Sequence, residues 1–151
     1  MIKNTIKALF SYILITVVAV FMMLSLKKLT SPLVLRIVMI LYSLIILILF
    51  YLSGFLVNTR YRKNKALKSY NLIIFIGLII FIASLIFSKF YIKAELFTEK
   101  YFIFNIINQA MYLVLKSFFM PVNAITSFIG FLLTKLLYSL GVISKYNLRK
   151  W

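Results

Sequence analysis

Amide, hydroxyl and amine side chains recur at helical spacing in the last third of this otherwise apolar chain. Offsets of three and four residues put such side chains on one face of a helix, so they predict a polar stripe. Polar groups in an apolar environment must find hydrogen-bond partners, because leaving them unpaired is costly. The stripe is therefore the candidate site, and its members are Asn105, Asn108, Gln109, Tyr112, Lys116, Asn123, Ser127 and Thr134.

Two interpretations of the stripe stay open. In the first, the stripe faces neighbouring helices and holds the bundle together, at about 0.6 kcal/mol for each hydrogen bond in a membrane. In the second, it meets a partner subunit or lines an aqueous path. The length of the stripe and the helix-breaking Pro121 within it motivate the second interpretation.

Few residues in the chain are suited to catalysis. It has no His, Cys or Asp, and its two acids, Glu95 and Glu99, lie in a basic connection typical of solvated charges. Lys116 and Lys135 interrupt apolar segments, and a desolvated lysine can act as a base or Schiff-base nucleophile. Snorkelling of both lysines to an interface is the simpler interpretation. We therefore expect no enzyme, cofactor or metal site, with a membrane enzyme using Lys116 or Lys135 as the alternative.

The composition indicates a membrane protein of one domain, residues 1–151. Apolar residues make up 64% of the chain, against about half in a soluble domain. The chain has eighteen basic residues and only two acidic ones. In a soluble protein that excess of positive charge would suggest binding to nucleic acid. Here the basic residues lie between long apolar runs, as in membrane proteins. We therefore expect lipid, and not nucleic acid, as the partner.

The apolar runs predict an all-α bundle of four transmembrane helices. A span needs about 20 apolar residues, and suitable runs lie at about 8–26, 37–57, 72–92 and 117–141. Residues 101–116, which carry most of the stripe, are predicted to form an amphipathic helix at the membrane interface. In the alternative, 101–119 and 122–142 are two separate spans joined by a very tight turn.

A basic connection at 58–71 predicts the orientation of the bundle. It carries five positive charges and no acid: Arg60, Arg62, Lys63, Lys65 and Lys68. With four spans and a cytoplasmic N-terminus, eleven of the eighteen basic residues lie on the cytoplasmic side, as the positive-inside rule favours. Both termini are then cytoplasmic. The same charges predict contact with anionic lipids, at about 1 kcal/mol for each residue.

These features predict a small multi-pass protein that acts by interaction, as an accessory subunit or membrane factor without catalysis of its own. Its partner would be another membrane protein or further copies of itself. The alternative is a pore-forming oligomer, which resembles the holin class in size and basic tail, or the membrane component of a small transporter. The abundance of Ile, Phe, Lys, Asn and Tyr is typical of an AT-rich genome and favours a bacterial plasma membrane.

Overall fold

The computed structural model describes residues 2–58, 63–89, 101–118, 120 and 122–148. This part of the chain is helical and contains no strand. Four of the described stretches are long and apolar enough to cross a membrane: Ile2–Leu26, Pro32–Leu56, Lys63–Phe87 and Ala124–Leu148. The elements are α1 (Ile2–Leu26), α2 (Pro32–Ser53), the 3-10 turn η1 (Gly54–Leu56), α3 (Lys63–Lys68), α4 (Asn71–Phe87), α6 (Phe102–Ile107), α7 (Gln109–Ser117) and α8 (Ala124–Leu148).

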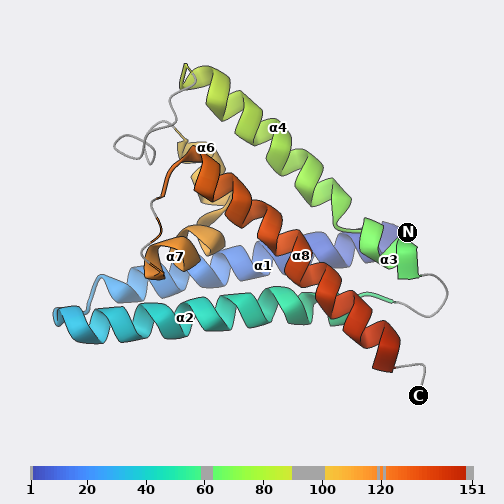
Figure 1. Ribbon diagram of the computed structural model, residues 1–151, viewed down its shortest axis with the longest axis horizontal. Helices are drawn as coiled ribbons and strands as arrows, with labels where there is room; N and C mark the ends of the chain where they lie inside the picture. Colours follow the sequence, from blue (N-terminus) through green and yellow to red (C-terminus); the bar gives the residue numbers. More distant parts are fainter. Residues whose placement is uncertain (1, 59–62, 90–100, 119, 121, 149–151) are drawn as a thin grey trace.

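The long helices form two pairs, α1 with α2 and α4 with α8, and the two pairs diverge from one end of the molecule (Figure 1). The first pair is α1 and α2, which run antiparallel, side by side. Helix α8 crosses α2 and η1, and α4 packs on α6 and α8. The short helices α6 and α7 fill the angle between the pairs, with α7 contacting α1, α2 and α8.

Helix α2 begins earlier than the apolar run predicts, at Pro32 and not at residue 37. Proline suits the first helical position, because its fixed φ matches the helix and its missing N–H has no partner there. The charged Arg36, which ended the apolar count, lies within the first turns and is exposed. Helix α1 likewise extends back to Ile2, through Lys3 and Lys7.

The segment predicted as one amphipathic helix over 101–116 differs from that expectation. It forms two short helices, α6 and α7, which meet at Asn108. Most of α7 is buried, including Met111, Leu113 and Val114. It is packed inside the bundle because the side opposite the polar stripe is mostly apolar. Neither helix is long enough to span, since nine residues cover only about 14 Å.

Helix α8 is displaced towards the C-terminus relative to the expected span at 117–141, and it covers Ala124–Leu148. Its start is a reciprocal cap: the Thr126 N–H donates to Asn123 Oδ1 over 2.9 Å, and the Asn123 N–H donates to Thr126 Oγ1 over 3.0 Å. Such caps satisfy N–H groups that have no partner within the helix and contribute about 1 kcal/mol. Helix α4 ends at Phe87, and residues 90–92 of its expected span lie outside the described residues, as does Pro121.

The end of α2, with the turn η1 that follows it, meets α8 at two glycines. A Cβ added to Gly141 would lie 1.9 Å from the Tyr51 carbonyl oxygen, and one added to Gly54 would lie 2.4 Å from that of Tyr138. Both obstacles are backbone atoms, which cannot move aside as a flexible side chain would. Small residues let helix backbones approach closely, as in membrane helix pairs. The divergence of the two helix pairs therefore starts from this crossing.

Tyr12 lies at the centre of the aromatic core. Its ring centroid is 5.9 Å from Phe50 of α2, 6.2 Å from Tyr70 before α4, and 6.3 Å from Phe131 of α8. Its hydroxyl donates to the Ile107 carbonyl at the end of α6 over 2.9 Å. One side chain of α1 thus contacts four other parts of the bundle.

Candidate functional site

The structure distributes the predicted polar stripe over three helices. Asn105 lies on α6, Asn108 at the break after it, and the next three members on α7, while the rest cap or belong to α8. Four members are buried: Asn105, Asn108, Ser127 and Thr134. Lys116 is exposed, and Gln109, Tyr112 and Asn123 are half-buried. The stripe therefore does not lie on one face of a single helix, because its residues belong to three helices that run in different directions.

Several stripe residues bond to this chain's own helices. The Asn108 side-chain amide donates to the Ser127 carbonyl over 2.9 Å, and the Thr134 hydroxyl donates to the Phe131 carbonyl over 2.7 Å. The Gln109 amide donates to the Met23 sulfur of α1. The bonds of Asn108 and Gln109 join α7 and the residue before it to α8 and α1, whereas the Thr134 bond lies within α8. Asn108 Oδ1 and Ser127 Oγ are buried and have no hydrogen-bond partner among the described residues.

Chain segments that are far apart in sequence meet at one end of the bundle, here called the termini end. The Lys7 ammonium donates to the Leu56 carbonyl over 3.3 Å, and the Lys145 ammonium donates to the carbonyls of Phe55 and Val57, the latter over 2.7 Å. The Asn4 side-chain amide donates to the Asn58 carbonyl over 3.0 Å. The start of α1, the end of α2 and the end of α8 thus lie together.

These two lysines were not singled out in the sequence. They act on carbonyls that the end of α2 leaves without helical partners, where a positive charge also complements the helix dipole. Neither lysine caps its own helix, and the carbonyls that they bond lie at least 49 residues away, so the sequence carried no local signal for this role. The topology prediction only counted Lys7 and Lys145 among the cytoplasmic charges, so it missed their hydrogen bonds to the end of α2.

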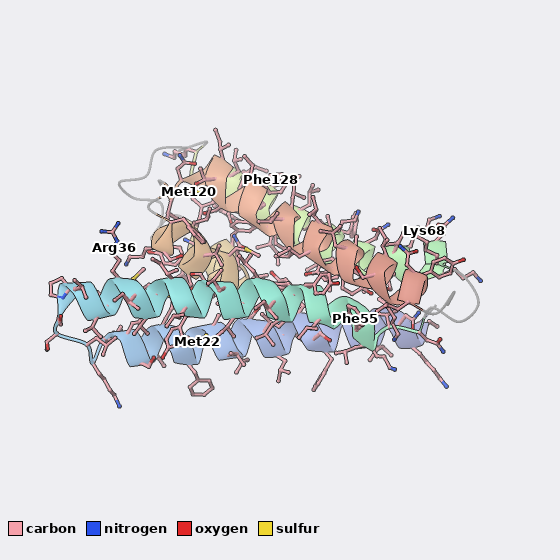
Figure 2. All side chains as sticks on the ribbon, turned by 60° about the horizontal axis from the view of Figure 1, so that its bottom comes forward. Met22, Arg36, Phe55, Lys68, Met120 and Phe128 are labelled. Atoms are coloured by element: carbon pink, nitrogen blue, oxygen red, sulfur yellow. The ribbon has the colours of Figure 1, made fainter. Side chains whose placement is uncertain are left out.

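The predicted basic patch is described in part. Three residues of the patch lie on α3 at the termini end: Lys63, Lys65 and Lys68. Figure 2 shows Lys68 at this end of the bundle and Arg36 near the other end. Lys65 and Lys68 are exposed, and the Lys63 Nζ is 5.6 Å from the centre of the Tyr146 ring of α8. Arg60 and Arg62 lie outside the described residues.

The two candidate catalytic lysines, Lys116 and Lys135, lie on different helices, α7 and α8. Lys116 lines a cavity of about 230 Å³ with Arg36, Pro32 and Ser117, so its neighbour there is a second cation. Lys135 is half-buried on α8. Glu95 and Glu99 lie outside the described residues, so neither lysine can be paired with them here.

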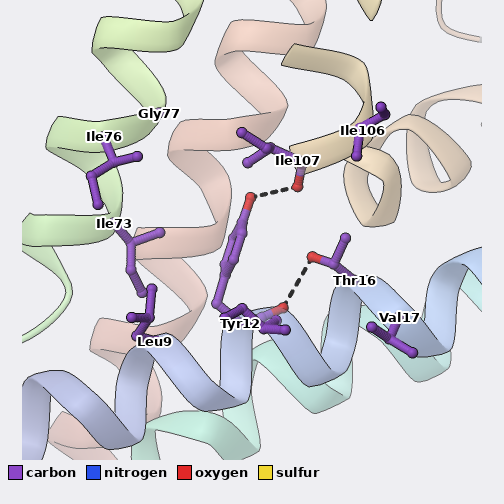
Figure 3. Close-up of a pocket in the computed structure, with 10 residues that line it drawn as sticks. Leu9, Tyr12, Thr16, Val17, Ile73, Ile76, Gly77, Ile106 and Ile107 are labelled. Atoms are coloured by element: carbon purple, nitrogen blue, oxygen red, sulfur yellow. Dashed lines mark hydrogen bonds between the residues drawn. The ribbon is translucent and has the colours of Figure 1, made fainter. Parts of the chain in front are cut away.

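A second cavity, the lateral pocket, opens between α1, α4 and α6 (Figure 3). Its volume is about 270 Å³, and it is lined by five residues of α1, three of α4 and two of α6. Nine of the ten are labelled in Figure 3, where Leu9 of α1 and Ile73 of α4 lie next to each other, beside Tyr12. The lining is apolar except for Tyr12 and Thr16, whose hydroxyls donate to backbone carbonyls.

Comparison with family models, curated proteins and solved structures finds no match to this chain. What the site can do therefore follows from its geometry.

That geometry offers binding surfaces more than reactive groups. The buried hydroxyls of Ser43 and Ser117 bond to each other over 2.6 Å, and those of Ser69 and Tyr138 do the same over 2.6 Å. These groups use their bonding capacity to join helices. The lateral pocket, in contrast, is accessible from outside and presents hydrocarbon.

Proposed function

We propose that this chain is a multi-pass integral membrane protein that acts by interaction, as an accessory subunit or small membrane factor. The observation that carries the proposal is that large apolar side chains are exposed on the outside of the bundle, whereas small hydroxyl side chains are buried inside it. Phe21 and Phe87 are 67% and 86% exposed, whereas Ser43 and Thr134 are fully buried. Soluble proteins rarely expose large contiguous apolar surfaces, but a bilayer solvates them. We propose a bacterial plasma membrane as the location, because the composition is typical of an AT-rich genome.

An interaction role is supported by how the polar groups are used. Several amides and hydroxyls between the helices bond within the chain, as with Asn108 to Ser127 and Tyr12 to Ile107. Lys7 and Lys145 bond to the carbonyls at the end of α2. The bonds that Asn108 and Gln109 make to neighbouring helices support the first interpretation, in which the stripe joins the helices of the bundle. Function then rests on the outer surfaces.

The proposed topology can be tested with single cysteines, because the chain has none of its own. Thr30, Asn64 and Asn147 are exposed and lie in the α1–α2 turn, on α3 and near the end of α8. We expect a membrane-impermeant maleimide to label Thr30→Cys in intact cells. Asn64→Cys and Asn147→Cys should react only after permeabilisation, because both belong to the cytoplasmic side. Labelling of Asn147→Cys in intact cells would contradict this topology.

The interaction role predicts that induced expression leaves the membrane potential unchanged. A potential-sensitive dye measures this directly in growing cells. The tagged chain, purified in mild detergent through two affinity steps, should retain one membrane protein, or further copies of itself, at a fixed ratio. Depolarisation on induction would overturn the proposal in favour of a pore-forming oligomer. A chain that purifies as a lone monomer would also contradict it.

A further inference from the structure

The lateral pocket has the size and lining of a hydrocarbon site. Its volume of about 270 Å³ is near the lower end, roughly 300 Å³, of small-molecule sites. The pocket is apolar, and its two hydroxyls are already bonded to the carbonyls of Ile107 and Tyr12. An occupant therefore gains contact with hydrocarbon and finds no free polar group of the lining to bind.

The pocket opens sideways, towards what would be the lipid phase. Ile13 of α1 is 53% exposed, Ile76 of α4 is 40% exposed and Ile106 of α6 is 50% exposed, although all three line it. Helix α4 packs on α6 and α8, which leaves a gap on the α1 side. Gly77 keeps α4 close to α8, because a Cβ there would lie 2.0 Å from the Phe131 ring. The gap is thus built into the packing of α4.

Positive charge lies beside the pocket on its termini side. Exposed Lys3 precedes Leu9 by six residues of the same helix, a rise of about 9 Å. Exposed Lys68 lies on α3, five residues before Ile73. A headgroup at the termini end would therefore meet one cation of α1 and one of α3, the short helix that precedes α4. The closest chemical match is a lipid with an anionic headgroup, since basic residues near a membrane surface attract such lipids.

We propose that the lateral pocket holds an acyl chain of an anionic phospholipid whose headgroup lies at the termini end, near Lys3 and Lys68. The inference rests on the membrane location proposed above, which cysteine labelling tests separately. The bound lipid fills the gap between α1 and α4 and joins them. It is therefore a structural component of the bundle and not a transported substrate.

The test compares lipids with identical chains in native mass spectrometry of the full chain released from detergent micelles. We expect dioleoyl-phosphatidylglycerol to be retained at one molecule per chain, at least tenfold more than dioleoyl-phosphatidylcholine. The double variant Lys3→Gln with Lys68→Gln should lower retention of phosphatidylglycerol to the level of phosphatidylcholine. Equal retention of both lipids by the wild type would overturn the headgroup assignment.

Bulky substitutions test the pocket itself. Ile13→Trp should lower phosphatidylglycerol retention at least tenfold, while its neighbour Leu14→Trp, equally exposed at 53% but outside the lining, should leave it unchanged. Ile76→Trp and Ile79→Trp repeat this comparison on α4, should an α1 variant fail to fold. Equal retention by the variants within each pair would overturn the pocket as the site. A dimer of the chain that forms as bound lipid is lost would also overturn the pocket as a lipid site.

Discussion

Replacing Gly141 with alanine is expected to lower the free energy of unfolding by about 3 kcal/mol or more, because inserted atoms in a packed interior cost roughly 1–3 kcal/mol even where neighbours can adjust. Here the obstacle is the backbone of α2: the new Cβ would lie 1.9 Å from the Tyr51 carbonyl oxygen and 3.2 Å from the Gly54 Cα. The two helices must move apart to accept it. Such a movement also disturbs α8 where it packs on η1.

The matched control is Gly130→Ala on the same helix. Its Cβ would meet Leu115 Cδ1 and Met111 Cβ at 3.4 Å, which is ordinary contact with side chains. Alanine is a better helix former than glycine by about 0.8–1.0 kcal/mol, so this variant should stay within about 1 kcal/mol of the wild type. The free energies of unfolding of both variants can be measured by titration with SDS in mixed micelles, followed by the near-UV circular dichroism of the tyrosines. Similar losses for the two variants would contradict a specific crossing at Gly141.

The existence of the long helices could be predicted from the sequence. Apolar runs between charges located four helices that are long and apolar enough to cross a membrane, and the part of the chain that the structure describes contains four. The ends of those helices were less predictable. Hydropathy counts stop at a charge or proline, whereas helix ends are decided by backbone geometry, as Pro32 shows at the start of α2. The Asn123–Thr126 cap likewise places the start of α8 seven residues beyond the predicted 117.

The arrangement of the helices could not be read from the chain. Periodicity places polar residues on one face but does not say what that face meets, and a break between helices changes the face altogether. Asn108 ends α6 and precedes α7, so the stripe turns at that residue. The glycines carried a usable signal, because only four occur in 151 residues. Gly54 and Gly141 are 87 residues apart, however, and no local rule pairs them.

Removing the ring of Tyr12 is the second change for which we expect a large effect. Tyr12→Ala should lower the free energy of unfolding by about 3–5 kcal/mol, as truncation of a large buried aromatic does. The side chain is 6% exposed and contacts the rings of Phe50, Tyr70 and Phe131. Its loss would leave a void where α1, α2 and α8 meet. Because Tyr12 also lines the lateral pocket, the void would join that pocket and enlarge it.

Tyr12→Phe separates the ring from the hydroxyl. It keeps the aromatic contacts and loses only the bond to the Ile107 carbonyl, so we expect a cost of about 0.5–1.5 kcal/mol. The same SDS titration measures both variants, and phosphatidylglycerol retention should survive the phenylalanine change, since the pocket keeps its shape. A loss in Tyr12→Phe as large as in Tyr12→Ala would mean that the bond to the end of α6, and not ring packing, makes Tyr12 essential. The short helices would then depend on one hydrogen bond for their place between the two helix pairs.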